Sequence, residues 1–289
     1  MPPTSPTTGA TTGVTAAAAA PSRSWQRAFA DLADGWRQRP LWGYLGWQDI
    51  KQRYRRSVLG PLWISISMAV IAVALGVLYG ALFQQPIEEF LPYLATGLLI
   101  WNFISGCILD GSEVFIDNEG LIKHLAAPLS VHIYRLIWRQ AIFFAHNFVI
   151  WVILFLIFRW QLDWTFLLVI PAILLLVING TWLALVVGIV STRFRDLPPV
   201  IAALTQLLFF VTPIVWNYDI FAANPDVAER ARLAELNPVM HFVEIVRRPL
   251  LGDPEVLRHW IVAIAITLVG WGVALLFMRN YRARVAYWV

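Results

Sequence analysis

The chain has 289 residues, of which 59% are hydrophobic and 14% charged, and its mean hydropathy is +0.65. Soluble domains carry a charge on about a quarter of their residues, so this composition excludes an ordinary soluble enzyme and predicts a polytopic, all-α membrane protein. The net charge of +4 comes from 20 arginines and 2 lysines, which membrane topology explains better than binding to nucleic acid.

Residues 1–39 are expected to form a disordered cytoplasmic tail, because the first 24 are rich in Pro, Thr, Ala and Gly and lack the regions of a signal peptide. An amphipathic interfacial helix is predicted over residues 40–58. Its apolar stripe, Trp47, Ile50, Tyr54 and Val58, should lie on an anionic leaflet. Its basic residues either bind phosphate head groups or only anchor the chain on the positive side of the membrane: Lys51, Arg53, Arg55 and Arg56.

The dipeptide Gly60-Pro61 ends this helix and opens a membrane domain that we expect over residues 59–279, followed by a tail over 280–289. Charge-poor segments predict six membrane spans, at about 61–83, 90–109, 140–158, 164–190, 197–216 and 260–278. Six spans place both termini on one side, and that side carries 16 lysines and arginines against 6 on the other. The positive-inside rule therefore predicts a multi-pass plasma-membrane protein with cytoplasmic termini.

Two connections are too long to be simple turns. On the cytoplasmic side, Asp117 or Asn118 can cap a short helix over residues 118–125, whose apolar face suggests a docking element. A loop packed on its own protein is the alternative. On the outer side, Asn237 can cap a helix that begins at Pro238. That segment could close an exit or merely dip into the interface.

The chain lacks the chemistry of an ATPase or a metalloenzyme. No Gly-x-x-x-x-Gly-Lys-Ser/Thr motif occurs, so ATP binding by a P-loop is excluded. His241 and Glu244 share a helix face, but two ligands do not make a zinc site. His146 and Asn147 lie inside the third span, where hydrogen bonding between helices is the commoner role and a functional one the alternative. The single cysteine, Cys107, excludes an intramolecular disulfide.

Aromatic side chains mark the first and fifth spans. They are Trp63, Tyr79 and Phe83 in the first, and Phe209, Phe210 and Trp216 in the fifth. Sugar rings stack their C–H faces on aromatic rings, so such a path suits a polysaccharide better than an ion. Packing against lipid explains each aromatic taken alone.

Several motifs resemble those of one family. Residues 48–63 (QDIKQRYRRSVLGPLW) look like the N-terminal signature of the permease subunit of polysaccharide ABC exporters, the Wzm-, KpsM- and TagG-like members of the ABC transmembrane type-2 family. Residues 194–199 (FRDLPP) with 206–214 (QLLFFVTPI) are similar to the family's fifth-span motif, and residues 236–238 (LNP) to its outer motif. The likeness covers residues 40–280.

The resemblance implies a permease that is not itself an enzyme. It would form a homodimer joined to two copies of a Wzt-like ATPase, which uses ATP and Mg²⁺. The cargo would be an O-antigen- or cell-wall-galactan-type glycan on a polyprenyl pyrophosphate, moved among membrane lipids with no cofactor in this chain. Residues carried over as sites are the ATPase contacts Asn118, Leu121, Ile122, Lys123 and Leu125; the interfacial residues Trp47, Lys51, Arg53, Tyr54, Arg55 and Arg56; the channel residues Trp63, Ser67, Tyr79, Phe83, Phe209, Phe210 and Trp216; and the outer gate residues Asn237, Pro238, His241 and Glu244.

Three alternatives stay open. A capsule or teichoic-acid exporter belongs to the same family, and a drug- or lipid-exporting permease to the same superfamily. A channel or secondary carrier would need intramembrane charges, and the predicted spans contain no series of them.

Overall fold

A computed structural model describes residues 23–55, 57–124, 127–253 and 256–289. Arg56 and Leu125, both expected to be site residues, lie outside the described part of the chain. Within that part, every regular element is a helix. The expectation of an all-α membrane protein is therefore confirmed.

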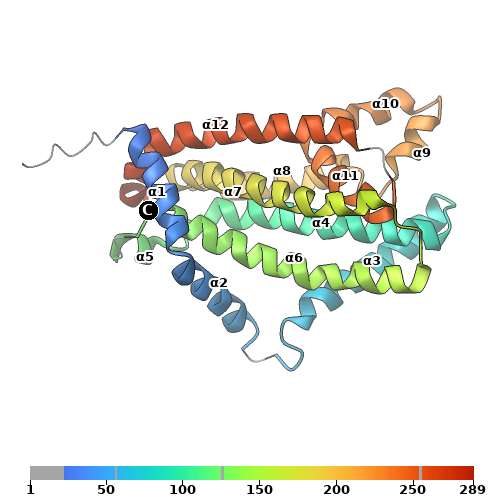
Figure 1. Ribbon diagram of the computed structural model, residues 1–289, viewed down its shortest axis with the longest axis horizontal. Helices are drawn as coiled ribbons and strands as arrows, with labels where there is room; N and C mark the ends of the chain where they lie inside the picture. Colours follow the sequence, from blue (N-terminus) through green and yellow to red (C-terminus); the bar gives the residue numbers. More distant parts are fainter. Residues whose placement is uncertain (1–22, 56, 125–126, 254–255) are drawn as a thin grey trace, which may run out of the picture.

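Among the described residues, five helices are long and apolar enough to cross a membrane, and they run roughly side by side (Figure 1). They are α3 (Leu62–Leu82), α4 (Ile87–Glu113), α6 (Ser130–Phe158), α7 (Val169–Arg193) with the short helix η1 (Trp164–Leu168) before it, and α12 (Leu257–Trp288). α6 begins ten residues before the predicted span, because its first turns pack their polar side chains against neighbouring helices. α12 continues through the predicted C-terminal tail.

The fifth predicted span, residues 197–216, is shorter than expected. α8 (Leu197–Val211) ends five residues early, because Thr212 is extended and precedes Pro213, which cannot continue a helix. Four short elements follow: α9 (Tyr218–Ala223), α10 (Ala228–Arg232), η2 (Leu233–Leu236) and α11 (Pro238–Leu251).

α4 forms the centre of the molecule, with 17 of its 27 residues buried. It packs against α3, α6, α7, α8 and α11. Small residues bring α4 and α7 close together, since a Cβ on Gly111 would lie 2.9 Å from the Cα of Ala184. Such close backbone approach is the usual way in which membrane helices associate.

The N-terminal region contains a helix that the sequence reading missed. Residues 25–37 form α1 (Trp25–Arg37), so the prediction of disorder over 1–39 is wrong there. The Oγ of Ser24 caps the helix by accepting a hydrogen bond from the N–H of Arg27 at 3.1 Å. The buried carboxylate of Asp31 accepts bonds from the N–H groups of Leu129 and Ser130 at the start of α6. This long-range contact fixes α1.

The interfacial helix also differs from its prediction. α2 (Arg39–Arg53) ends at Arg53, with Tyr54 as its C-cap, and does not reach Val58. Its inner side faces α6, since a Cβ on Gly46 would lie 3.0 Å from Trp138. Ile50 is buried on α2, whereas Trp47 and Val58 are exposed. The four stripe residues therefore do not form one continuous lipid-facing surface.

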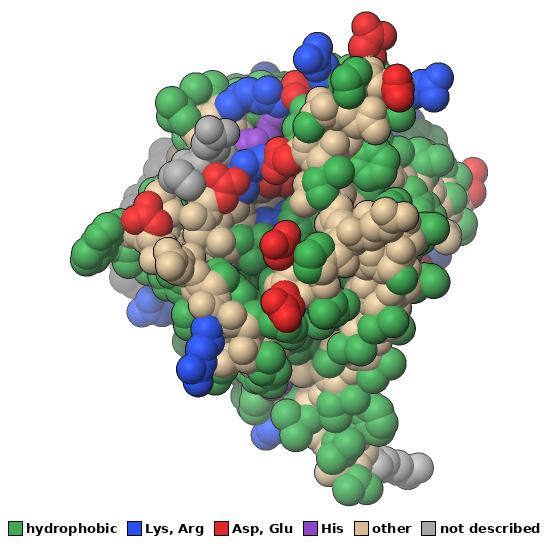
Figure 2. Space-filling view, turned by 90° about the vertical axis from the view of Figure 1, so that its right-hand side faces the viewer, with side chains coloured by type: hydrophobic (Ala, Val, Ile, Leu, Met, Phe, Trp, Pro, Cys, Tyr) green, Lys and Arg blue, Asp and Glu red, His purple; other side chains and the backbone are tan. Residues whose placement is uncertain are grey.

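The bundle has two distinct ends. α1, α2, α5 (Glu119–His124) and the C-terminus lie together at one end, named here the proximal end (Figure 1). α9, α10 and η2 form the opposite, distal end. Seen from the distal end, acidic, basic and histidine side chains gather in the upper half, and hydrophobic side chains dominate the tapering lower part (Figure 2).

Candidate functional site

The short helix α5 presents the predicted docking residues at the proximal end. Leu121 and Ile122 are half-buried, and Lys123 is exposed. Its Nζ donates to Glu119 Oε1 at 2.6 Å, and this hydrogen bond lowers the pKa of Glu119. Asn118 does not cap α5. Its Nδ2 donates to the carbonyl oxygen of Val114 at 2.8 Å, which holds the loop that leads into α5.

Asn118 also connects α5 to a set of ion pairs, named here the proximal network: Asp49, Asp110, Asn118, Arg135, Arg139 and Gln140. Arg135 donates from Nη1 to Asn118 Oδ1 at 2.9 Å, and from Nε and Nη2 to both carboxylate oxygens of Asp49 at 2.8 and 2.5 Å. Arg139 and Gln140 both donate to Asp110 Oδ2, at 2.8 and 2.7 Å. One fork-shaped arginine thus joins the segment before α5 to α2.

The cationic residues predicted for the interfacial helix face outward. Lys51, Arg53 and Arg55 are exposed, and Tyr54 is half-buried. The guanidinium of Arg53 lies 5.6 Å from the ring centre of Phe143 on α6. These side chains are therefore available to anionic groups beside the start of α3.

The predicted channel aromatics divide into two groups. Phe209 and Phe210 line a groove of about 510 Å³ between α3, α4 and α8, named here the α3–α8 groove. Phe209 packs on Trp101 with ring centres 5.5 Å apart. Asn102 and Gln206 give the same groove polar groups. A mixed aromatic and amide lining suits a sugar better than lipid alone.

The second group lies toward the distal end. Tyr79 stacks on Phe83 at 5.7 Å, and Phe221 lies 5.8 Å from Phe83 and 5.6 Å from Trp216. The structure thus brings three predicted channel residues together with Phe221, which the sequence reading did not single out. Trp63 is exposed near the proximal end of α3, apart from both groups.

The predicted gate residues hold the distal end together. Asn237 caps α11 by accepting from the N–H of Val239 at 3.0 Å, and its Nδ2 donates to Thr212 Oγ1 at 2.7 Å. The motif around Thr212 and the motif around Pro238 therefore contact each other directly. His241 Nδ1 lies 2.9 Å from His259 Nδ1, in a buried pair.

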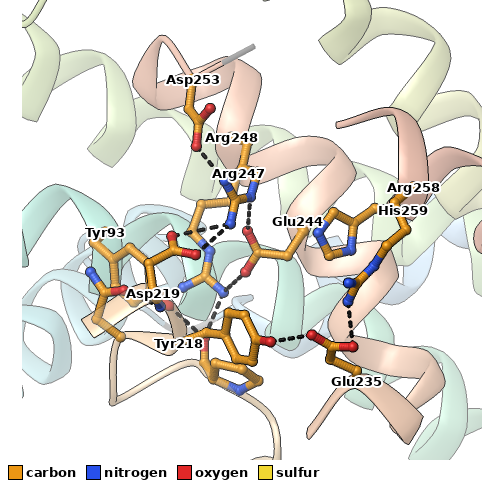
Figure 3. A network of polar contacts seen from close by, with 12 residues as sticks. Tyr93, Tyr218, Asp219, Glu235, Glu244, Arg247, Arg248, Asp253, Arg258 and His259 are labelled. Carbon is orange, nitrogen blue, oxygen red and sulfur yellow. Dashed lines mark hydrogen bonds and ion pairs between the residues drawn. The ribbon is translucent and has the colours of Figure 1, made fainter. Parts of the chain in front are cut away.

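The most buried charge in this region is Arg247, which the sequence reading did not select. Its side chain is 1% exposed, pairs with Glu244 at 2.8 Å, and stacks over Tyr93 at 3.9 Å from the ring centre (Figure 3). Its Nη2 donates to the carbonyl oxygen of Pro213 at 2.5 Å. Tyr93 donates to the carbonyl oxygens of Pro213 and Trp216, both at 3.2 Å. These bonds satisfy backbone carbonyl groups just beyond α8, where the chain is no longer helical.

Further charged side chains lie around Arg247 and Glu244 (Figure 3). Arg248 pairs with Glu244 at 3.0 Å, Asp219 at 2.9 Å and Asp253 at 2.5 Å. Burial opposes the charge of Arg248, but the three carboxylates outweigh burial and raise its pKa. Near Arg248, a polar cavity of about 390 Å³ is lined by Tyr218, Asp219, Glu235, Arg248, Val256, Leu257, Arg258 and His259.

Glu235 links two of these elements. Arg258 pairs with it at 2.8 Å, and Tyr218 donates a hydrogen bond to it. Burial would raise the pKa of Glu235, but the hydrogen bonds from Arg258 and Tyr218 outweigh burial and lower it. The described residues contain no group of three or more His, Cys, Asp or Glu side chains that could hold a metal ion.

A family model described as ABC-2 type transporter matches residues 40–251, which is most of the chain. The chain belongs to the ABC-2 type transporter family. It is 23% identical over 235 residues to an O-antigen export system permease protein RfbA of Myxococcus xanthus, covering 80% of this chain and 88% of that protein. A Klebsiella pneumoniae protein of the same name is 23% identical over 173 residues, covering 60% and 67%.

The match extends over most of the sites described in this ABC-2 type transporter, but not over the residues 256–259 that line the polar cavity. It begins at α2 and ends with α11, so it includes the proximal network, the α3–α8 groove and Arg247. α1 and α12 lie outside it, although α1 packs against both α6 and α12. A sequence signal for Arg247 did exist, because Glu244, Arg247 and Arg248 recur at spacings of three and four in an otherwise apolar helix.

Proposed function

We propose that this chain is the permease subunit of an ATP-driven exporter that moves a lipid-linked polysaccharide across the plasma membrane. The observation that carries the proposal is the family match over residues 40–251, together with relatives named as O-antigen export permeases. The five long apolar helices found in the described part of the chain agree with it. ATP hydrolysis then belongs to a separate subunit, since this chain lacks a P-loop motif.

The functional assembly would contain two copies of this chain and two copies of an ABC ATPase. α5 supports an ATPase contact, because it is a short helix at the proximal end with no fully buried residue. A second copy would cover the apolar residues on α8 that are exposed in one chain and lie outside the α3–α8 groove, among them Val200, Leu204 and Leu207. In this arrangement the proximal end faces the cytoplasm, as the excess of arginine there predicts.

The glycan would travel along the α3–α8 groove. Trp101 and Phe209 offer aromatic faces there, and Asn102 and Gln206 offer amides. We expect the paired changes Trp63→Ala and Phe209→Ala to block export, because they remove an aromatic face at the start of α3 and one inside the groove. Wild-type export by that double variant would contradict this path.

The proximal network would carry motion from the ATPase into the membrane. Arg135 holds both Asn118, just before α5, and Asp49, on α2. A displacement of α5 would therefore pull on α2 through a bidentate pair with short bonds. The exposed cations of α2 would then meet the pyrophosphate of the carrier lipid at the start of its path.

Depletion of the protein tests the export proposal. Cells that lose this chain should accumulate a polyprenyl-pyrophosphate-linked glycan on the cytoplasmic side, which mass spectrometry of the extracted lipid identifies. Re-expression of the wild-type chain should restore its surface form. Accumulation of a free lipid or a drug, with normal surface glycan, would refute the proposal and favour the drug- or lipid-exporting alternative.

A further inference from the structure

A second space opens beside the α3–α8 groove. It is a cleft of about 260 Å³ between α3 on one side and α4 and α6 on the other. Met68, Ile71 and Asn102 line both spaces, so the cleft adjoins the groove. Its volume lies just below the roughly 300–1,000 Å³ of typical ligand pockets. It therefore suits one small group.

Three amide side chains give this cleft its chemistry, and we name it the amide cleft after them: Asn102, Gln140 and Asn147. Asn147 is 4% exposed, and its Oδ1 makes no hydrogen bond within the described chain. Gln140 is also 4% exposed and donates one amide hydrogen to Asp110. Asn102 is exposed, although it lies on the mostly buried helix α4. A buried oxygen without a donor costs free energy, and this oxygen is closed off from solvent in the conformation described. A turn of the Asn147 amide would bring it to the cleft, where a ligand that donates hydrogen bonds would satisfy it.

The remaining walls define what kind of ligand fits. Phe103, Phe143 and Phe144 supply aromatic faces, and Ser67 supplies a hydroxyl. The described lining contains no charged side chain, so an anion would lack a partner inside the cleft. One outward-facing cation, Arg53, lies over the ring of Phe143 at the edge of the lining. A neutral polyol fits the lining, with an anionic neighbour held outside near Arg53.

We propose that the amide cleft binds one neutral sugar ring of the lipid-linked glycan, with its hydroxyls on Asn102, Gln140 and Asn147 and its C–H faces on the phenylalanines. The inference rests on the proposed export function and adds a binding site to it. As the sugar ring leaves the surface of α2, its hydroxyls exchange their hydrogen bonds to water for hydrogen bonds to these amides. The adjoining α3–α8 groove then receives the next rings.

A cysteine reporter can detect an occupant of this cleft. Ser67→Cys changes one atom of the lining, and Cys107→Ala removes the native thiol. The full-length chain with its ATPase is reconstituted in lipid nanodiscs and labelled with a water-soluble maleimide. The matched control reporter is Val149→Cys, on the exposed side of α6 two residues from Asn147. We expect the thiol of the Ser67→Cys variant to react at least tenfold faster, because the cleft is polar and open.

Octyl glucoside, kept below its micelle concentration, serves as the probe. It should slow the labelling of the Ser67→Cys variant, whereas a tetraethylene glycol ether of the same alkyl length should not. Adding Asn147→Leu should weaken the protection by the glucoside by roughly 3- to 10-fold, the effect expected for the loss of one hydrogen bond. The control Asn179→Leu removes an amide that is equally buried but bonded to Thr267, outside the cleft, and should leave the protection unchanged.

Three results would overturn the inference. Equal labelling of the two reporters would mean that lipid fills the cleft. Fast labelling without protection would mean that only water fills it, and equal protection by both amphiphiles would mean that it binds alkyl chains. None of these results depends on transport. Refutation of sugar binding in the cleft is therefore distinguishable from refutation of the export proposal, which the depletion experiment tests by itself.

Discussion

Arg247→Met tests whether a buried arginine secures the backbone beyond α8. Methionine keeps much of the side-chain volume but loses the pair with Glu244 at 2.8 Å, the bond to Pro213 at 2.5 Å and the stacking over Tyr93. Removal of one partner from a buried ion pair costs about 3–5 kcal/mol. Glu244 keeps its bond to Arg248 at 3.0 Å, so we expect the lower value, about 3 kcal/mol, or on the order of 100-fold in the unfolding equilibrium.

The native thiol of Cys107 allows the loss of stability in Arg247→Met to be measured. Cys107 is fully buried, so a maleimide dye that fluoresces on reaction reports unfolding as the purified protein is heated. A loss of about 3 kcal/mol should lower the Tm by at least about 6 °C, at about 2 °C per kcal/mol. The control Arg230→Met, on the exposed surface of α10, should change stability by no more than about 0.5 kcal/mol.

A second variant separates charge from volume. Glu244→Leu combined with Arg247→Met removes both buried charges, and we expect it to be more stable than Arg247→Met alone, since no uncompensated carboxylate remains. Arg248 still pairs with Asp219 and Asp253 in that double variant. An unchanged Tm for Arg247→Met, or a double variant less stable than the single one, would refute the reasoning.

Three further predictions concern the two ends of the bundle. Asp49→Asn and Arg135→Gln should each reduce export while the ATPase still co-purifies, and a double-mutant cycle of Tm values should give a coupling of about 0.5–3 kcal/mol. Leu121→Asp should abolish co-purification of the ATPase without a change in Tm, because the half-buried side chain belongs to the proposed docking face. The pKa of Glu235 lies below its ordinary 4.5, so its contribution to stability is complete above pH 4.5 and is lost as the pH falls through the lower, folded-state value. Hydrogen exchange in residues 218–236 should therefore accelerate in acid.

Each of these predictions has a matched control. The exposed pair of Asp34 and Arg37 should show a smaller coupling than the proximal pair, and equal couplings would argue against a special role for Arg135. Leu121→Met keeps an apolar side chain and should retain the ATPase; retention by Leu121→Asp as well would remove α5 from the contact. Glu235→Gln should abolish the acid-induced step in hydrogen exchange. A step that persists in that variant must come from another group.

The features that could be predicted from the sequence are local ones. Long apolar runs bounded by charged residues specify membrane helices wherever they occur. Most ends of five predicted spans therefore lie within about four residues of the helix ends. The exceptions are the start of α6 and the end of α12, each ten residues outside the predicted bound. α1 illustrates what a local pattern misses. A Cβ on Gly35 would clash with Ser130 Oγ, so the need for glycine at this position comes from a helix that follows almost a hundred residues later.

The same difference between local and long-range features applies to the candidate site. The motifs around Thr212 and Asn237 could be recognised in the sequence, but their direct hydrogen bond depends on the path of the chain between them. Arg135 and Arg247 were counted only as topology-setting charges. Each of them forms bonds to residues more than 30 positions away, and no local pattern predicts such a partner.

The early end of α8 has a consequence for the membrane itself. Fifteen residues of helix span about 22 Å, whereas a typical hydrocarbon core is about 30 Å thick and α4, which lines the same groove, is about 40 Å long. This hydrophobic mismatch should thin the bilayer locally where lipid reaches α8 at the edge of the proposed contact between two copies. The apolar barrier is then lowest along the wall where the glycan is proposed to pass, so the shape of the bilayer, as well as the lining of the groove, shortens the route for a polar chain.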